Sequence, residues 1–201
     1  MRPSLSSCLL ALLAAVAIAL LEQSAAPVNA DELSPDLAAA RTALDKYHDP
    51  FTAIREGYLS TVGCVAFTTA STMNGMPYPV GGMGVHFINF SLVGPTLDPT
   101  KPQVLIYEPM ADGTLKLAAA EWFMPYKAGM KPPQLFGHQF YGPMMGHYPV
   151  MPKELVHYDL HVWLWKPNPA GMFVPTNPDI KCPATGYTFA QSTPDMPAPM
   201  P

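Results

Sequence analysis

The chain has 201 residues, of which 25 are proline, and its formal net charge is −4. This length fits one domain, and the many prolines exclude long helices and long central strands, because proline interrupts both. The 11 lysines and arginines never cluster, so the sequence lacks the basic surface that nucleic acid or an acidic membrane would require.

The first 30 residues have the pattern of an export signal. Arg2 precedes an apolar run from Leu9 to Leu21, and the small residues in Val28-Asn29-Ala30 match a signal-peptidase cleavage site. The run is shorter than the about 20 residues that a membrane-spanning helix needs. We therefore predict that residues 1–30 are removed, and that the remainder is a soluble, secreted or periplasmic protein without a membrane span.

That compartment decides how the cysteines are interpreted. Cys8 leaves with the signal, whereas Cys64 and Cys182 remain in an oxidising space, where two thiols most simply form one disulfide. For a loop of about 100 residues, chain entropy gives a stabilisation on the order of 4 to 5 kcal/mol. Lipidation of Cys8 is the alternative, although the apolar run would then be expected before the cysteine and not after it.

Two short helices are predicted before Gly57. Ser34 followed by Pro35 is a favourable helix start, and the pattern begins again at Pro50. Apolar residues recur at helical spacing in both segments, namely Leu37, Ala40, Leu44 and Tyr47, then Phe51, Ile54 and Tyr58.

Short apolar runs bounded by Gly, Pro, Asn or Asp predict at least five strands after the helices. These runs are Cys64–Thr69, Val85–Phe90, Val104–Glu108, Leu115–Phe123 and Val156–Lys166. Asp112-Gly113 suits a tight hairpin turn between the third and the fourth. Residues 125–152 form a long connection without clear periodicity, and residues 184–201 are predicted to be a disordered tail.

The predicted fold is α+β. We expect a single globular domain over residues 31–183, with two short N-terminal helices packed on a curved antiparallel sheet or partial β-barrel. The disulfide between Cys64 and Cys182 would join the beginning of this domain to its end.

Familiar catalytic signatures, such as HExxH, CxxC, a phosphate-binding glycine loop and Gly-x-Ser-x-Gly, are absent from the sequence. Their absence disfavours serine hydrolase and nucleotide chemistry and leaves histidines and acids placed inside apolar strands. His86 lies in a strand that is apolar on both faces, so its imidazole should be buried. A buried imidazole is either hydrogen-bonded or metal-bound, and both interpretations stay open.

Glu108 and Glu121 lie on either side of the predicted hairpin. A two-residue turn would place Val104 opposite Glu121 and put both glutamates on the apolar face, whereas a three-residue turn would separate them. A carboxylate buried there needs a partner or a raised pKa. An offset of four residues is about 13 Å along a strand, so one ion could bind both only in a strongly bent sheet. Glu121 is the favoured interior group.

The run Val156–Lys166 alternates between an apolar face and a second, mixed face. The second face carries His157, Asp159, His161, Trp163 and Trp165. Two tryptophans argue against a solvent-exposed face and indicate the wall of a cleft or barrel. Asp159 and His161 could reach one ion, or Asp159 could orient an imidazole that binds the ion. His157 and His161 are too far apart to share one.

Met144, Met145 and Met151 surround His147 in the long connection. Thioether and imidazole ligands together select copper(I), but methionine also fills gaps in cores that have little regular structure. Both interpretations remain.

Several segments together resemble a family of exported bacterial proteins that has no established activity. They are Gly84–Asn89, Tyr107–Pro109, Leu135–Gly137, Leu160–Trp165, Asn168-Pro169 and Asn177–Cys182. The resemblance covers roughly residues 47–182. It implies an exported bacterial domain and supplies neither a mechanism nor site residues.

Three functions fit these residues. The first is a mononuclear site for one divalent zinc, copper, iron or manganese ion, at which an open coordination position would permit catalysis. Its ligands would be His86, Glu121 and His161, with Glu108 or Asp159 as additions. The second is a binding pocket for a small apolar or aromatic molecule, lined by Phe87, Trp122, Trp163 and Trp165. The third is a structural envelope protein whose histidines bond to buried carbonyl groups.

Overall fold

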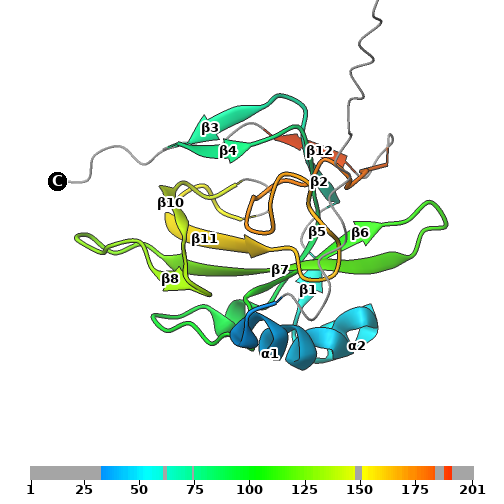
Figure 1. Ribbon diagram of the computed structural model, residues 1–201, viewed down its shortest axis with the longest axis horizontal. Helices are drawn as coiled ribbons and strands as arrows, with labels where there is room; N and C mark the ends of the chain where they lie inside the picture. Colours follow the sequence, from blue (N-terminus) through cyan, green and yellow to red (C-terminus); the bar gives the residue numbers. More distant parts are fainter. Residues whose placement is uncertain (1–32, 61–62, 74, 148–150, 184–187, 192–201) are drawn as a thin grey trace, which may run out of the picture.

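The computed structural model describes residues 33–60, 63–73, 75–147, 151–183 and 188–191. The predicted signal peptide lies outside these residues. Within them the chain is mostly β-sheet. An open eight-stranded sheet runs through the molecule between the N-terminal helical segment and a small hairpin of β3 (Ser71–Met73) and β4 (Met76–Tyr78) (Figure 1). None of the helices in the described residues is long and apolar enough to cross a membrane.

The main sheet contains strands from the whole length of the described chain. They are β1 (Leu59–Ser60), β2 (Cys64–Phe67), β5 (Gly81–Ile88), β6 (Val104–Pro109), β7 (Leu115–Pro125), β10 (Tyr141–Met144), β11 (His157–Val162) and β12 (Thr188–Gln191). Their order is β10-β11-β7-β6-β5-β2-β12, with β1 paired to β5. Neighbouring strands are antiparallel, except that β12 is parallel to β2. The sheet therefore stays open and does not close into a barrel.

The five predicted strands are present, and shorter ones join them. The long connection contains β10 and a separate pair, β8 (Gln134–Leu135) with β9 (His138–Gln139), and β12 lies within the predicted tail. Strands of two to four residues are too short to show a period of two. The last long strand ends at Val162, because the next amide, that of Trp163, donates to the Met172 carbonyl at 3.0 Å and leaves the sheet.

The helical segment consists of short elements. These are α1 (Pro35–Leu44), the 3-10 helix η2 (Asp45–His48) that continues it directly, α2 (Pro50–Arg55) and, later in the chain, the 3-10 helix η3 (Phe90–Leu92). Proline occupies the first position of α1, and Asp49 caps α2 by accepting a hydrogen bond from the Phe51 amide at 3.0 Å. The Tyr107 hydroxyl on β6 donates to the Tyr47 carbonyl at 2.7 Å, which fixes η2 to the sheet.

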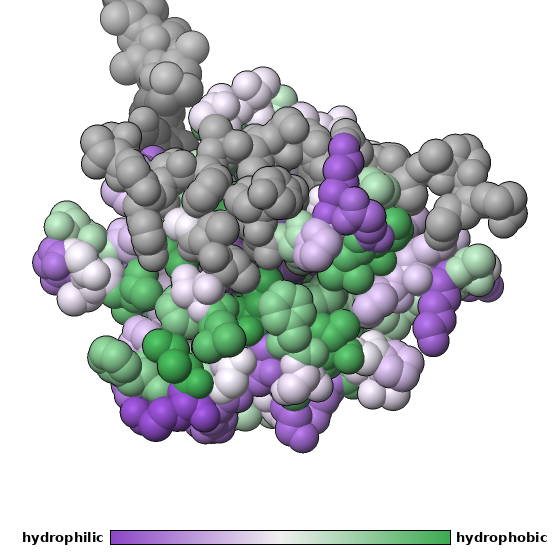
Figure 2. Space-filling model, turned by 180° about the vertical axis from the view of Figure 1, so that it is seen from behind, coloured by the Kyte–Doolittle hydropathy of each residue, from purple (hydrophilic) through white to green (hydrophobic). Residues whose placement is uncertain are grey.

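Some large apolar side chains stay exposed. They are Phe51, Ile54, Leu59, Val80, Phe90 and Met110. The face opposite to that of Figure 1 mixes apolar with polar residues (Figure 2). Scattered exposed apolar residues are ordinary for a folded protein, so they do not by themselves indicate a partner surface.

The β6–β7 hairpin has the predicted pairing at its interior end. Val104 pairs with Glu121, and Ile106 pairs with Ala119. Glu121 thus takes its place opposite an apolar, fully buried residue of β6. This is the interior position that the sequence favoured for it.

The turn of this hairpin differs from the prediction. The Gly113 amide donates to the Met110 carbonyl, and the Met110 amide donates to the Thr114 carbonyl, so the loop has one residue more than expected. Gly113 has φ +84°, a conformation that favours glycine. One unpaired residue in β7, Ala118, then forms a bulge that shifts the register back. Two opposite shifts cancel, so Glu121 keeps its partner.

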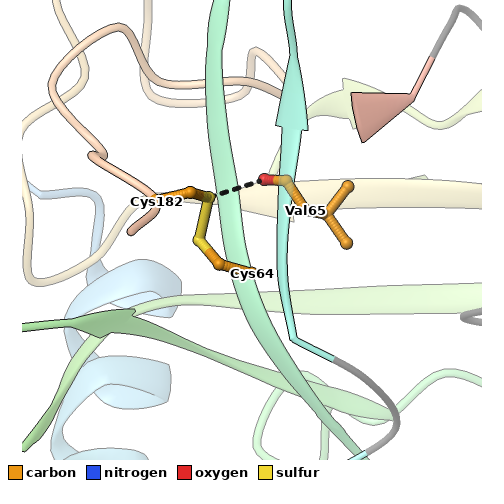
Figure 3. The surroundings of a disulfide bond; sticks show 3 residues. All are labelled: Cys64, Val65 and Cys182. Atoms are coloured by element: carbon orange, nitrogen blue, oxygen red, sulfur yellow. Dashed lines mark hydrogen bonds between the residues drawn. A yellow bond between two sulfur atoms is a disulfide. The ribbon is translucent and has the colours of Figure 1, made fainter. Parts of the chain in front are cut away.

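The predicted disulfide is present and joins β2 to the loop that follows the last long strand (Figure 3). Cys64 and Cys182 are 118 positions apart in the sequence, and their Cα atoms are 5.5 Å apart. Cys64 is fully buried, and the Cys182 sulfur lies 3.4 Å from the Val65 carbonyl oxygen.

Replacing both cysteines, Cys64→Ser with Cys182→Ser, should lower the free energy of unfolding by about 2 to 5 kcal/mol, because the unfolded chain regains the freedom that loop closure removes. Denaturant unfolding of the variant and the parent measures the difference. The parent treated with a reductant should show a comparable loss. Unchanged unfolding midpoints in both samples would contradict a stabilising role for the bond.

Candidate metal centre

Three strands of the main sheet bring polar side chains to one buried place. His86 on β5, Glu121 on β7 and His161 on β11 each offer a ligand atom, and these atoms lie within 4.8 Å of one another. His161 and Glu121 are directly paired across β11 and β7. We call these residues the first cluster. They are the three residues around which the sequence predicted a metal site.

His86 reaches this place across an intervening strand. β6 lies between β5 and β7, so the two backbones are separated by about twice the 4.8 Å spacing of neighbouring strands, and a curved sheet is needed for their side chains to meet. Gly84, two residues before His86, has φ +93°, and a Cβ there would lie 2.7 Å from the Tyr107 carbonyl oxygen. Glycine is therefore required for the path that β5 takes toward the cluster.

Two distances within the first cluster are close to those between ligands of one ion. Glu121 Oε2 lies 3.7 Å from His86 Nε2 and 3.6 Å from His161 Nε2. Both distances exceed those of hydrogen bonds, about 2.7–3.2 Å. Ligand atoms bound at about 2.0–2.2 Å to a tetrahedral ion lie about 3.3–3.6 Å from one another. The carboxylate of Glu121 is thus placed to share an ion with either imidazole rather than to bond to it.

Burial determines which protonation states the first cluster favours. His86, Glu121 and His161 expose only 5 %, 3 % and 1 % of their surfaces. Burial lowers the pKa of His86 to about 4. Burial, together with the neighbouring imidazoles, lowers the pKa of His161 well below its usual value. Burial and the charge of Asp159 raise the pKa of Glu121 well above its usual value. Without a cation the uncharged forms are favoured, so the close contacts are not ion pairs.

Several of these buried atoms lack hydrogen bonds. Both ring nitrogens of His161 have no hydrogen-bond partner in the described structure. A buried polar group without a partner costs about 1–3 kcal/mol. The lone pair of a neutral imidazole is a common metal ligand. An ion at the first cluster would occupy a lone pair of His161 that the protein itself leaves unmatched.

A second group of donors lies beside the first. His147, His157 and Asp159 also place ligand atoms within 4.8 Å of one another. His157 and Asp159 are buried on β11, and His147 is partly buried just after β10. We call these residues the second cluster. Asp159 Oδ1 is 4.0 Å from His161 Nδ1, so the expected proximity of Asp159 to His161 is present, but Asp159 belongs to the second group.

Only part of the second cluster could be predicted from the sequence. The alternation of the run Val156–Lys166 put His157, Asp159 and His161 on one face, as found, but offered no partner for His157. His147 lies in a segment without periodicity, and its position depends on how that segment folds back on β11. The usable signal was the His-x-Asp-x-His alternation, combined with a histidine ten residues earlier.

Both clusters line one cavity of about 20 Å³. Apolar side chains complete its wall: Met83, Ile88, Val104 and Met151. A water molecule needs about 10–15 Å³, whereas a pocket for an organic ligand measures about 300 Å³ or more. The cavity therefore admits metal ions or a water-sized molecule, but no organic ligand.

The four aromatic residues of the alternative pocket, Phe87, Trp122, Trp163 and Trp165, are not among the residues that line this cavity. Each is engaged in its own packing or hydrogen bond within the fold. The Phe87 ring packs on Tyr107 at 4.8 Å, and the indole nitrogens of Trp122, Trp163 and Trp165 donate to Asp98 O, Val174 O and Asp45 Oδ1. The structure gives them roles in packing that need no ligand.

Glu108 lies outside both clusters. Its carboxylate accepts hydrogen bonds from Lys166 Nζ at 2.9 and 3.0 Å, and the longer turn pairs it with Lys116. The ammonium group balances the charge of the carboxylate, so no cation is needed there. Glu108, which the sequence offered as an additional ligand, is not among the donors that converge in either cluster.

Comparisons of the chain with family models, with curated proteins and with solved structures found no match. What the centre can do follows from its own chemistry. Each cluster combines two imidazoles with one carboxylate, a ligand set that suits zinc, iron, manganese or copper.

Proposed function

We propose that the protein binds one divalent transition metal ion through His86, Glu121 and His161, and that it does so outside the cytoplasm as an exported bacterial domain. The main support for the proposal is that three buried side chains from different strands bring their ligand atoms within 4.8 Å of one another. The carboxylate of Glu121 lies 3.7 and 3.6 Å from the two imidazoles, too far for hydrogen bonds to them. Side chains that served only the packing of the core would be expected to satisfy one another.

The spacing favours a tetrahedral ion. Adjacent ligands of a six-coordinate ion lie about 3.0 Å apart at the same bond lengths, which is shorter than the 3.6 and 3.7 Å found here. Two imidazoles and one carboxylate leave a fourth position for water, as in catalytic zinc sites. Zinc is therefore the ion that we expect first at this cluster.

The cavity limits what such an ion could do. A zinc-bound water has its pKa lowered to about 7 and is a nucleophile at neutral pH. The wall formed by Met83, Ile88 and Val104 leaves space beside the ion only for water-sized molecules. The proposed function is accordingly metal binding, and any catalysis would be restricted to substrates of about that size.

Protein stripped of metal should bind added zinc and gain stability. At a free zinc concentration of 1,000 times Kd, linkage gives about 4 kcal/mol, which raises Tm by on the order of 10 °C for a domain of this size. Elemental analysis and calorimetry measure the bound zinc and the Tm. His161→Ala should lose one equivalent, while His48→Ala, at an exposed histidine outside both clusters, should behave like the parent. Less than about a tenth of an equivalent bound, without a change in Tm, would contradict the proposal.

A further inference from the structure

The second cluster has its own complete set of metal ligands. Its members, His147, His157 and Asp159, are all different from those of the first cluster. We infer that it binds a second transition metal ion beside the first, so that the protein holds a two-metal centre. This inference uses the proposed function only for the neighbouring ion, because the donors of the second cluster stand by themselves.

His157 is held in the form that can bind a metal. Its Nδ1 lies 3.0 Å from the Leu155 carbonyl oxygen, which can only accept, so Nδ1 carries the proton and donates it. The lone pair is then at Nε2, which is buried and has no hydrogen-bond partner. A backbone carbonyl that fixes the tautomer in this way is the usual support of a metal-binding histidine.

Asp159 faces this lone pair without bonding to it. Its Oδ2 is 3.8 Å from His157 Nε2, and its Oδ1 has no hydrogen-bond partner in the described structure. If His157 and Asp159 served only as a buried hydrogen-bonded pair, the separation would be about 2.7–3.2 Å. The separation found is again close to that of two ligands on one tetrahedral ion.

A thioether makes the second cluster the softer of the two. Met144 pairs with His157 across β10 and β11, and its sulfur lies 3.2 Å from His147 Nε2. Met144 is fully buried, and the side chain of Met151 lines the same cavity. Thioether and imidazole ligands favour copper(I) over zinc. The second ion should therefore be a soft transition metal ion, and copper(I) is the one that we expect to bind most tightly.

Asp159 lies between the two clusters. Its Oδ2 is 3.8 Å from His157 Nε2 in the second cluster, and its Oδ1 is 4.0 Å from Nδ1 of His161 in the first. The second distance is too long for a hydrogen bond, so we assign Asp159 to the second ion only.

The stoichiometry of bound metal tests the inference. Stripped parent protein should bind two equivalents of cobalt(II), measured by elemental analysis, with visible bands that grow until the second equivalent is added. His147→Ala, which removes a partly buried side chain, should bind one equivalent, and so should His86→Ala. The control His48→Ala should bind two.

Each proposal can fail separately in this experiment. One equivalent in the parent that is unchanged in His147→Ala would overturn the second site and leave the first intact. Two equivalents that are unchanged in His86→Ala would overturn the first site instead. Met144→Leu, which keeps the side-chain volume, should weaken copper(I) binding by about 10-fold or more while leaving zinc binding unchanged. Equal copper(I) affinity in Met144→Leu and the parent would overturn the assignment of a soft site.

Discussion

Replacing Glu121 by glutamine, Glu121→Gln, should weaken metal binding at the first cluster by about 100-fold or more while changing the stability of the metal-free protein by less than about 1 kcal/mol. The reason is the raised pKa of Glu121, which favours the protonated, neutral carboxyl when no cation is present. Glutamine has nearly the same shape and is also neutral, so the metal-free core is preserved. The ion, however, loses the only anionic ligand in the first cluster.

Calorimetric titration with zinc and denaturant unfolding of the stripped protein measure the two effects of this substitution. Glu108→Gln is the matched control, because Glu108 is bonded to Lys166 and lies outside both clusters. It should leave zinc binding unchanged. If Glu121→Gln bound zinc as tightly as the parent, a purely structural role for Glu121 would be the better explanation.

The metal-free protein should be most stable near pH 6.5 and should lose stability on both sides of that pH. Buried groups of both clusters cause this behaviour. Burial lowers the pKa of His86 and of His157 to about 4 and lowers that of His161 well below its usual value. Burial raises the pKa of Asp159 to about 7, and burial with the charge of Asp159 raises that of Glu121 well above its usual value.

The sign of each contribution follows from where the protons bind. Below pH 6.5 the unfolded imidazoles take up protons and the folded ones do not until about pH 4, so their stabilisation falls with falling pH. The carboxyl groups act oppositely, because above about pH 4 the unfolded chain releases protons that the folded chain keeps. Because three imidazoles act against two carboxyls, the free energy of unfolding should rise with pH up to about pH 6.5. Above that pH only the carboxyls remain, so the free energy of unfolding decreases.

Urea unfolding between about pH 4.5 and 8.5 in the presence of a chelator measures this profile. Asp159→Asn, which cannot ionise, should reduce the decrease between pH 6.5 and about 7. Zinc-loaded protein should lose less stability above pH 6.5, because the ligand carboxylate is then deprotonated in the folded as well as in the unfolded chain. A metal-free stability that rises steadily to pH 8.5 would contradict the assigned pKa directions.

The hairpin shows how far the sequence could position Glu121. The alternation of apolar residues predicted its pairing with Val104, and the pairing is present. The path between them was not predictable, because a longer turn and a bulge at Ala118 compensate for each other. Neither the longer turn nor the bulge changes the alternation of apolar residues beyond the turn, so neither could be predicted from it. The longer turn alone pairs Glu108 with Lys116, and Lys166 neutralises the charge of Glu108.

The second cluster shows what the sequence could not reveal. His157 and Asp159 were on the predicted face of β11, but their partner His147 comes from a segment with no period of its own. Local patterns report which face a side chain takes. They do not report which distant segment folds against that face.

The sequence by itself predicted the first cluster of His86, Glu121 and His161, the strand faces that carry these residues, and the disulfide between Cys64 and Cys182. The strand faces follow from local alternation, and the disulfide was predicted because only two cysteines follow residue 30. Only the tertiary structure shows that the side chain of His86 on β5 reaches that of Glu121 on β7 across the intervening strand β6. It also shows that the donors divide into two clusters around one cavity. The physical reason is that strand order and sheet curvature arise from packing among segments far apart in the chain. The alternation of residues along one strand contains no information about such distant partners.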